Sequence, residues 1–208
     1  KPDKTILIPC VRVAFPNMCQ RFATSLGYVV FASMINSLGE TSAAAHTIAN
    51  TVESGFYIPG WGMQTAAATL AGNALGAKDG KKLRDLERAI IPLETGLMTV
   101  CGALLFAFAP QLMTLFSRDA AVIRLISEPF YGIPIVLEGM MQGVGKTVAP
   151  FIFSVIGMWG VRIIGTFICT QLLGMGLIAA WACMIAHNVL LFVLFAVYFA
   201  RGKWKPKF

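Results

Sequence analysis

The chain has 208 residues, of which 57% are hydrophobic and only 13% are charged, and its mean hydropathy is +0.71. A soluble domain carries about 25% charged residues, so this composition argues against an ordinary soluble enzyme or binding domain. The formal net charge is +7, and the basic residues lie mainly in a few connectors. This arrangement indicates contact with a membrane surface, so the charge does not require a nucleic-acid partner.

Six long apolar runs alternate with short polar connectors, a pattern typical of an all-α, polytopic membrane protein. In chain order, the expected transmembrane helices are 13–38, 43–72, 89–116, 120–141, 148–173 and 176–200. Each is longer than the about 20 residues that a helix needs to cross a bilayer, so tilt or kinks are expected. Residues 1–208 are therefore predicted to form a single bundle of six transmembrane helices in the lipid bilayer.

The basic residues lie mostly on one side of this predicted bundle. Thirteen of the 17 lysines and arginines precede the first helix, follow the last, or lie in the second-to-third and fourth-to-fifth connectors. Cytoplasmic loops of membrane proteins are enriched in Lys and Arg. We therefore expect a multi-pass protein of the cell (plasma) membrane with both termini in the cytoplasm.

The first predicted helix carries a polar stripe. Asn17, Arg21, Thr24 and Tyr28 recur at i, i+4, i+7 and i+11 and so share one helical face. Tyr28 lies about ten residues from the outer end, or roughly 15 Å deep at about 1.5 Å per residue. A polar stripe at this depth indicates an aqueous cavity inside the bundle.

The second predicted helix has a matching stripe, formed by His46, Asn50, Glu53 and Tyr57. Glu53 lies near the bilayer midplane, and Pro59 with neighbouring glycines interrupts the helix just beyond it, as in helices around transporter sites. Because an ionisable residue there costs at least about 2.5–3.5 kcal/mol, we interpret Glu53 as an ion-coupling carboxylate. With Asn50 it offers oxygen ligands for Na⁺. The alternative is a structural carboxyl hydrogen-bonded to its neighbours, and His46 is interpreted as a packing residue.

Further ionisable residues lie in the third, fourth and sixth predicted helices. Glu138 shares a polar face with Tyr131 and Gln142 and is the next candidate for ion coupling. Glu94 is expected to reach the inner interface, and His187, alone in an apolar run, to be a packing residue. The expected substrate cavity is lined by Tyr28, Thr24, Asn17, Tyr57, Gln64 and Tyr131.

Two opposite charges fall at one depth in the fourth and fifth predicted helices. Glu128 lies 18 residues before Lys146, and Arg162 lies 16 residues after it. If the two helices are antiparallel neighbours, the side chains meet, and each charge neutralises the other. We predict a structural ion pair between Glu128 and Arg162, with a role toward a cationic substrate as the alternative.

The connector QGVGKT (142–147) ends like a phosphate-binding loop, G-x-x-x-x-G-K-[ST], but Met140 stands where that motif needs its first glycine. No predicted strand precedes it either. We interpret the segment as a short turn between two transmembrane helices, in which Gly143 and Gly145 end a helix and reverse the chain. The five cysteines show no ligand spacing, so neither a metal site nor a cofactor is expected.

One run resembles a known family closely. AAAHTIANTVESGFYIPGWGMQTAAATLAGNALGAKDGKKLR (43–84) resembles the second helix and basic loop of the C-terminal lobe of the multidrug and toxic compound extrusion (MATE) family. SLGYVVFASMINSLGE (25–40) resembles the first helix of that lobe, and QGVGKT resembles the family turn R-G-x-G-[DN]-T. The chain departs from the family at Lys146, where an acid is common, and at Tyr131, near a position that is acidic in some members.

The resemblance implies one six-helix lobe of a twelve-helix antiporter, completed by a second lobe on the same polypeptide or on a partner chain. The expected function is secondary active antiport, in which H⁺ or Na⁺ exchanges for amphiphilic, often cationic, small molecules. Two alternatives stay open: a flippase or exporter of a lipid-linked precursor, and a non-transporting membrane scaffold subunit. A midplane acid argues against the scaffold. The chain has no H-E-x-x-H motif and no nucleotide loop, so an enzyme is not expected.

Overall fold

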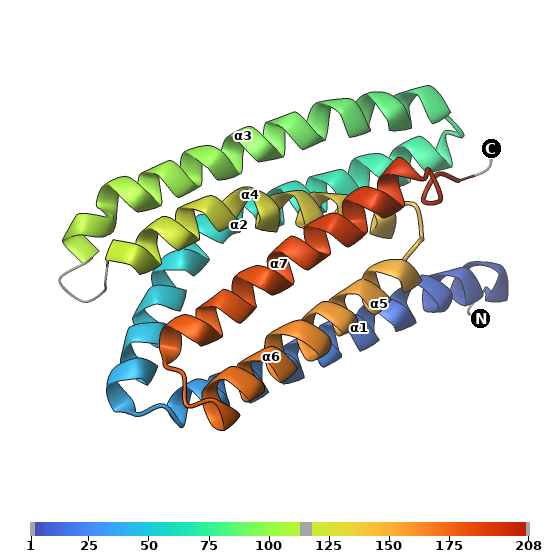
Figure 1. Cartoon of the computed structure of the whole chain (residues 1–208). Helices are drawn as coiled ribbons and strands as arrows, with labels where there is room; N and C mark the ends of the chain where they lie inside the picture. Colours follow the sequence, from blue (N-terminus) through green and yellow to red (C-terminus); the bar gives the residue numbers. More distant parts are fainter. Residues whose placement is uncertain (1–2, 113–117, 207–208) are drawn as a thin grey trace.

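The computed structural model describes residues 3–112 and 118–206, and it gives only the helical backbone of residues 6, 52, 53, 55, 56, 105–112 and 118–130. The described chain is helical throughout except for short turns (Figure 1). Its helices are α1 (Lys4–Asn36), α2 (Glu40–Gly76), α3 (Gly80–Leu112), α4 (Arg118–Gly143) and α7 (Leu177–Ala200). Between α4 and α7, one continuous helix comprises α5 (Val148–Val155), η1 (Ile156–Ile163), α6 (Ile164–Phe167) and η2 (Ile168–Leu172).

The helices expected from the apolar runs are confirmed as helices, although the first four begin earlier than expected, and residues 113–116 of the third lie outside the described residues. The first begins at Lys4 and not at residue 13, because the Asp3 side chain accepts a hydrogen bond from the Thr5 amide at 2.9 Å and caps the helix there. Two of the described helices, Val148–Leu172 and Leu177–Ala200, are long and apolar enough to cross a membrane on length and composition alone. The six spans as membrane crossings stay a prediction.

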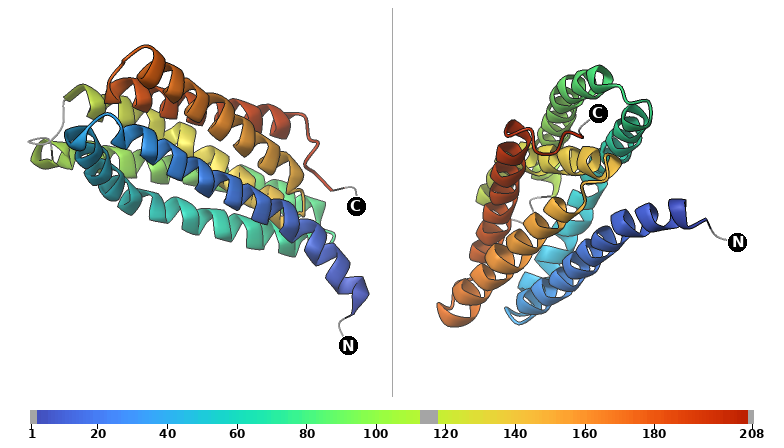
Figure 2. Two further views of the ribbon diagram at one scale, coloured as in Figure 1. Left: turned by 90° about the horizontal axis from the view of Figure 1, so that it is seen from below. Right: turned by 90° about the vertical axis from the view of Figure 1, so that its right-hand side faces the viewer.

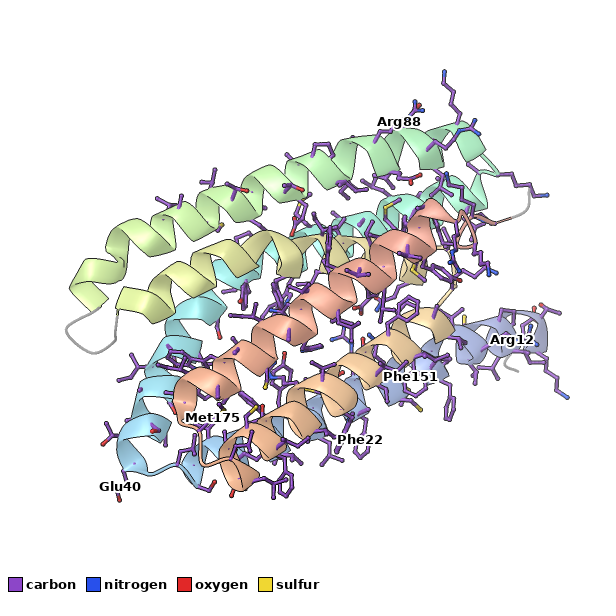
Figure 3. The ribbon with its side chains drawn as sticks, in the orientation of Figure 1. Arg12, Phe22, Glu40, Arg88, Phe151 and Met175 are labelled. Carbon is purple, nitrogen blue, oxygen red and sulfur yellow. The ribbon has the colours of Figure 1, made fainter. Side chains whose placement is uncertain are left out.

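The helices run roughly along one direction, so the connections gather at two ends of the bundle (Figures 1 and 2). The two chain termini and the turns 77–79 and 144–147 lie at one end, which we call the basic end. The turns 37–39 and 173–176 lie at the other, which we call the far end. Figure 3 shows Arg12 and Arg88 toward the basic end and Glu40 and Met175 toward the far end.

We expect the basic end to face the cytoplasm. A Glu40→Cys variant should react with an impermeant thiol reagent added outside intact cells, and a Lys82→Cys variant only after the membrane is opened. Both side chains are exposed, each in the first turn of its helix. The substitutions are made in a variant that lacks the five native cysteines, so that only the introduced cysteine can react. Labelling of both positions from the same side would contradict the predicted topology.

The largest buried cluster lies where α2 and α4 pack against each other, with α3 and α7 on either side. The backbones of α2 and α4 approach closely, because a Cβ atom at Gly139 would meet the Gln64 carbonyl oxygen and one at Gly143 would meet that of Ala68. Gly139 and Gly143 thus form a G-x-x-x-G contact of the kind that packs helices in membranes. Gly145, with φ of +76°, then reverses the chain in the 144–147 turn, as the sequence indicated.

Helices α1 and α5 form the opposite wall of the bundle, and α7 packs against both η1 and α4 (Figure 2). Helix α2 is bent, with Pro59 inside it, so that its two halves run in different directions in Figure 1. The stretch η1 is π-helical, and π-helical turns often occur at functional sites.

Candidate functional site: a polar cavity between two walls of helices

A cavity of about 540 Å³ lies between α1, α2, α4, the fifth helix and α7. This volume is within the range of small-molecule sites. Most of its lining residues carry a polar side-chain group, although the chain is largely hydrophobic. The lining residues are Gln20, Arg21, Thr24, Ser25, Tyr28, Trp61, Gln64, Thr65, Tyr131, Pro134, Ile135, Glu138, Ser154, Met158, His187, Asn188 and Leu191.

Glu138, on α4, is the carboxylate of this cavity. Its Oε1 accepts hydrogen bonds from Gln142 Nε2 at 2.8 Å and from Gln20 Nε2 at 3.1 Å. The side chain of Gln64 is a further hydrogen-bond partner, and the positive charge of Arg21 acts on the carboxylate. Three amide side chains from α1, α2 and α4 therefore converge on one acid. Amide donors hold a carboxylate in place without neutralising its charge, which leaves the acid able to bind a cation.

Oxygen atoms beside Glu138 complete a possible cation site. The Gln20 Nε2 also donates to Ser154 Oγ at 2.8 Å, and Gln20 Oε1 is buried with no hydrogen-bond partner among the described residues. A buried carbonyl oxygen without a partner costs free energy, which a bound proton donor or cation would recover. Carboxylate, amide and hydroxyl oxygens lie together here, and they suit either a proton or Na⁺.

Basic and aromatic groups also lie in the lining of the cavity or beside the lining residue Tyr28. Arg162, on η1, is 5% exposed, and its guanidinium carbon lies 4.2 Å from the ring centroid of Phe31 and 4.8 Å from that of Tyr28. These cation–π contacts stabilise a buried positive charge. His187, on α7, lines the cavity, and its Nδ1 has no hydrogen-bond partner within the described part of the chain. The sequence indicated only a packing role for His187, whereas in the structure His187 also lines the cavity.

An aromatic pair closes one side. Tyr131 lines the cavity, and the Tyr57 ring stacks on it with centroids 4.1 Å apart and an interplanar angle of 29°. Flat aromatic surfaces of this kind bind planar or cationic organic groups.

The structure brings several of the expected site residues together. Thr24, Tyr28, Gln64, Tyr131 and Glu138 all line the cavity. Two more touch it indirectly: Tyr57 stacks on Tyr131, and Asn17 Oδ1 accepts a hydrogen bond of 3.4 Å from Gln142 Nε2.

Other expected site residues lie elsewhere. Asn50 is exposed, and it precedes Gln64 by 14 residues on α2, about 21 Å along the helix. The side chains of Glu53 and Glu128 lie outside the described residues, so the role of Glu53 and the Glu128–Arg162 pair stay predictions. Arg162 is on η1, which packs against α1 and α7, whereas Glu128 is on α4.

Glu94 departs most from expectation. It was expected to reach the inner interface, but it is 0% exposed on α3. A Cβ atom on Gly60 or on Gly132 would lie 3.3 or 3.1 Å from its Oε1, so the carboxyl group sits between α2 and α4. Neither of its oxygens has a hydrogen-bond partner among the described residues. The helix begins at Gly80, so Glu94 lies about 21 Å along α3 from its start, too deep for its side chain to reach the surface.

Sequence reasoning missed Gln20, Ser154 and Asn188. Gln20 had a detectable signal, because it lies three residues after Asn17 and four before Thr24, on the stripe already identified. Ser154 is a single polar residue in an apolar run, and Asn188 follows His187 in another, so neither shows a periodic signal. Within the described residues, no group of three or more His, Cys, Asp or Glu side chains is placed to hold a metal ion.

Comparison with known proteins agrees with this architecture. A family model, MatE, matches residues 16–168. The probable multidrug resistance protein NorM of Thermotoga maritima is 28% identical over 206 residues, which cover 95% of this chain and 44% of that protein. The probable multidrug resistance protein YoeA of Bacillus subtilis is 24% identical, with 100% and 46% covered.

A solved structure described as a crystal structure of MATE in the bent conformation has the same fold, with a TM-score of 0.86 at 20% identity. That alignment covers 98% of this chain and 47% of the other, so the chain spans about half the length of the proteins it matches. The fold is therefore that of one lobe of such a transporter. Since the family match extends over well more than half of its residues, the chain belongs to the MatE family.

Proposed function

We propose that this chain is one six-helix lobe of a secondary active antiporter, which exchanges H⁺ or Na⁺ for amphiphilic, often cationic, compounds. The observation that carries the proposal is Glu138, an acid held by amide groups from three helices inside a cavity of about 540 Å³. The relatives named as multidrug resistance proteins support the substrate class. A second lobe, in the same polypeptide or in a partner chain, completes the transporter. The transporter lies in the plasma membrane, and both termini of the present chain are in the cytoplasm.

The exchange follows from competition for one negative charge. A proton or Na⁺ on Glu138 neutralises the carboxylate, and a cationic substrate can do so instead. If the two conformations of the transporter differ in their affinity for each cation, each ligand shifts the equilibrium by its differential affinity. The stacked Tyr57–Tyr131 pair supplies the apolar surface for the organic part of the substrate. Glu53 is a second candidate for ion coupling on α2, nearer the far end.

A second candidate function is export of an anionic, lipid-linked precursor. It is favoured by Arg21, which lines the cavity, and by buried Arg162, which lies beside Tyr28. One guanidinium group in the lining and a second beside a lining tyrosine would suit a phosphate-bearing substrate.

Transport by reconstituted vesicles distinguishes the two functions. With the complementary lobe present, an imposed proton or sodium gradient should drive accumulation of a fluorescent amphiphilic cation, and collapsing that gradient should stop it. Vesicles without protein and vesicles with a gradient of K⁺ serve as controls. Transport of a lipid-linked phosphate that ignores both gradients would reject antiport in favour of the second function.

A further inference from the structure

A second cavity lies at the basic end of the bundle and is independent of the polar cavity. It has a volume of about 420 Å³ and lies between the first turns of α3 and the C-terminal segment 201–206, which we call the tail. Its lining residues are Arg84, Glu87, Arg88, Ile91, Pro92 and Lys205. Cationic groups and an apolar floor thus occur in one cavity, which suits a ligand with a charged head and an apolar body.

The tail is part of the folded core. Trp204 is 0% exposed and stacks on Phe199, with ring centroids 4.4 Å apart. This packing fixes Lys205, whose Nζ lies 3.2 Å from Glu87 Oε2 and 5.4 Å from the centroid of the Trp204 ring. Lys205 therefore lines the cavity from the side of the tail.

The charges of this cavity favour an anion. Arg84 and Arg88 are four residues apart on α3, so their side chains lie one turn apart on the same face. Neither forms an ion pair with any described residue, whereas Glu87 is paired with Lys205. Guanidinium groups present paired N–H donors that match phosphate oxygens, so two arginines a turn apart are a suitable phosphate clamp.

The position of the cavity indicates where the phosphate comes from. Helix α3 lies at the edge of the bundle, packed against α2 and α4 (Figure 1). Beyond the cavity, toward the far end, α3 exposes Leu93 and Val100, which are 61% and 58% accessible. Exposed apolar side chains in a transmembrane bundle face lipid tails. Arg88 lies just before this apolar surface begins, toward the basic end (Figure 3), which is the level of the phospholipid headgroups.

We propose that Arg84, Arg88 and Lys205 bind the phosphate group of an anionic phospholipid headgroup, with Ile91 and Pro92 in contact with the start of its apolar part. The bound lipid then bridges α3 and the tail at the cytoplasmic surface. The ligand is a lipid of the surrounding membrane and not the transported compound, so the site is separate from the exchange at Glu138.

Titration of the purified protein in detergent tests this site. The probes are a short-chain phosphatidylglycerol, the matching phosphatidylcholine and inorganic phosphate, with thermophoresis as the readout. The Arg84→Gln/Arg88→Gln variant should bind phosphatidylglycerol on the order of tenfold more weakly, because it loses charge-assisted hydrogen bonds. Glu87→Gln should bind it several-fold more tightly, because it removes a repelling carboxylate and releases Lys205.

The matched control is Lys81→Gln/Lys82→Gln, which removes the same charge from exposed positions of the same helix that do not line the cavity. It should leave the affinity for phosphatidylglycerol within about twofold, since only long-range attraction is lost. An equal loss in the control, or weaker binding by Glu87→Gln, would overturn the site. If inorganic phosphate bound as tightly as phosphatidylglycerol, the proposal that the ligand is a lipid would be wrong. Unchanged melting temperatures of all variants ensure that the folded protein is compared.

Discussion

Replacement of Glu138 by glutamine is expected to abolish ion-driven export while leaving the protein folded in the membrane. Glutamine has the same shape and keeps an acceptor oxygen for Gln20 and Gln142, which hold Glu138 Oε1 at 3.1 and 2.8 Å. It cannot bind a proton or neutralise a cation. The coupled flux should therefore fall to the level of vesicles without a gradient, and binding of a cationic substrate should weaken on the order of tenfold.

The measurement is gradient-driven efflux by reconstituted vesicles, with substrate binding measured separately on the purified protein. Glu40→Gln, an exposed acid at the start of α2, is the matched control and should transport normally. Glu53→Gln should be assayed in parallel, since Glu53 is the other predicted coupling acid. Normal coupled efflux by Glu138→Gln together with loss in Glu53→Gln would move the coupling site to the far half of α2.

The helices were predictable because they depend on a local property. A run of about 20 apolar residues bounded by polar connectors indicates a helix whatever it packs against, and six such runs gave helices at the expected places. The turn at 144–147 was predictable for the same reason, because its glycines and its position between two apolar runs suffice. The helix ends were misjudged, since α1, α2 and α3 begin before the apolar residues that were expected to start them.

The site was predictable only in part, because its members meet through packing. The periodicity of α1 identified Thr24 and Tyr28, and that of α4 identified Glu138 and Tyr131. Gln20 and Glu138 are 118 residues apart, and no local pattern says that their helices face each other. The interpretation of the α2 stripe favoured Glu53, whereas the described part of α2 that reaches the cavity is the later segment with Trp61 and Gln64.

Close helix packing was also beyond the sequence reasoning, although the G-x-x-x-G pattern at Gly139 and Gly143 was present in it. The sequence analysis assigned Gly143 to the end of a helix and gave Gly139 no role. In the structure they let α4 approach the α2 backbone at Gln64 and Ala68, and the same contact sets Gln64 beside Glu138. The packing of the two helices and the geometry of the cavity therefore depend on one pair of glycines.

Gly143→Ala is accordingly expected to destabilise the protein, although alanine is the better helix former. Its Cβ would meet the carbonyl oxygen of Ala68 and lie 2.9 and 3.0 Å from the carbonyl carbon and Cα of that residue. Backbone atoms cannot rotate away as a side chain can, so α2 and α4 must separate. Overpacking of this kind costs about 1–3 kcal/mol of the free energy of unfolding, and the Gly139→Ala/Gly143→Ala variant should lose more than either single change.

Gly96→Ala, in the middle of α3, is the control for this effect. Nothing lies within 4 Å of a Cβ atom at that position, so alanine should be neutral or stabilise the protein by about 0.5–1 kcal/mol through its helix propensity. The measurement is the midpoint of thermal unfolding in detergent, followed by loss of the monodisperse peak. Opposite signs for Gly143→Ala and Gly96→Ala would show that the close approach of α2 and α4, and not helix propensity, sets the stability. If both variants were stabilised, α2 and α4 would not be in contact at these glycines, and Gln64 would then have to reach Glu138 from a different packing of the two helices.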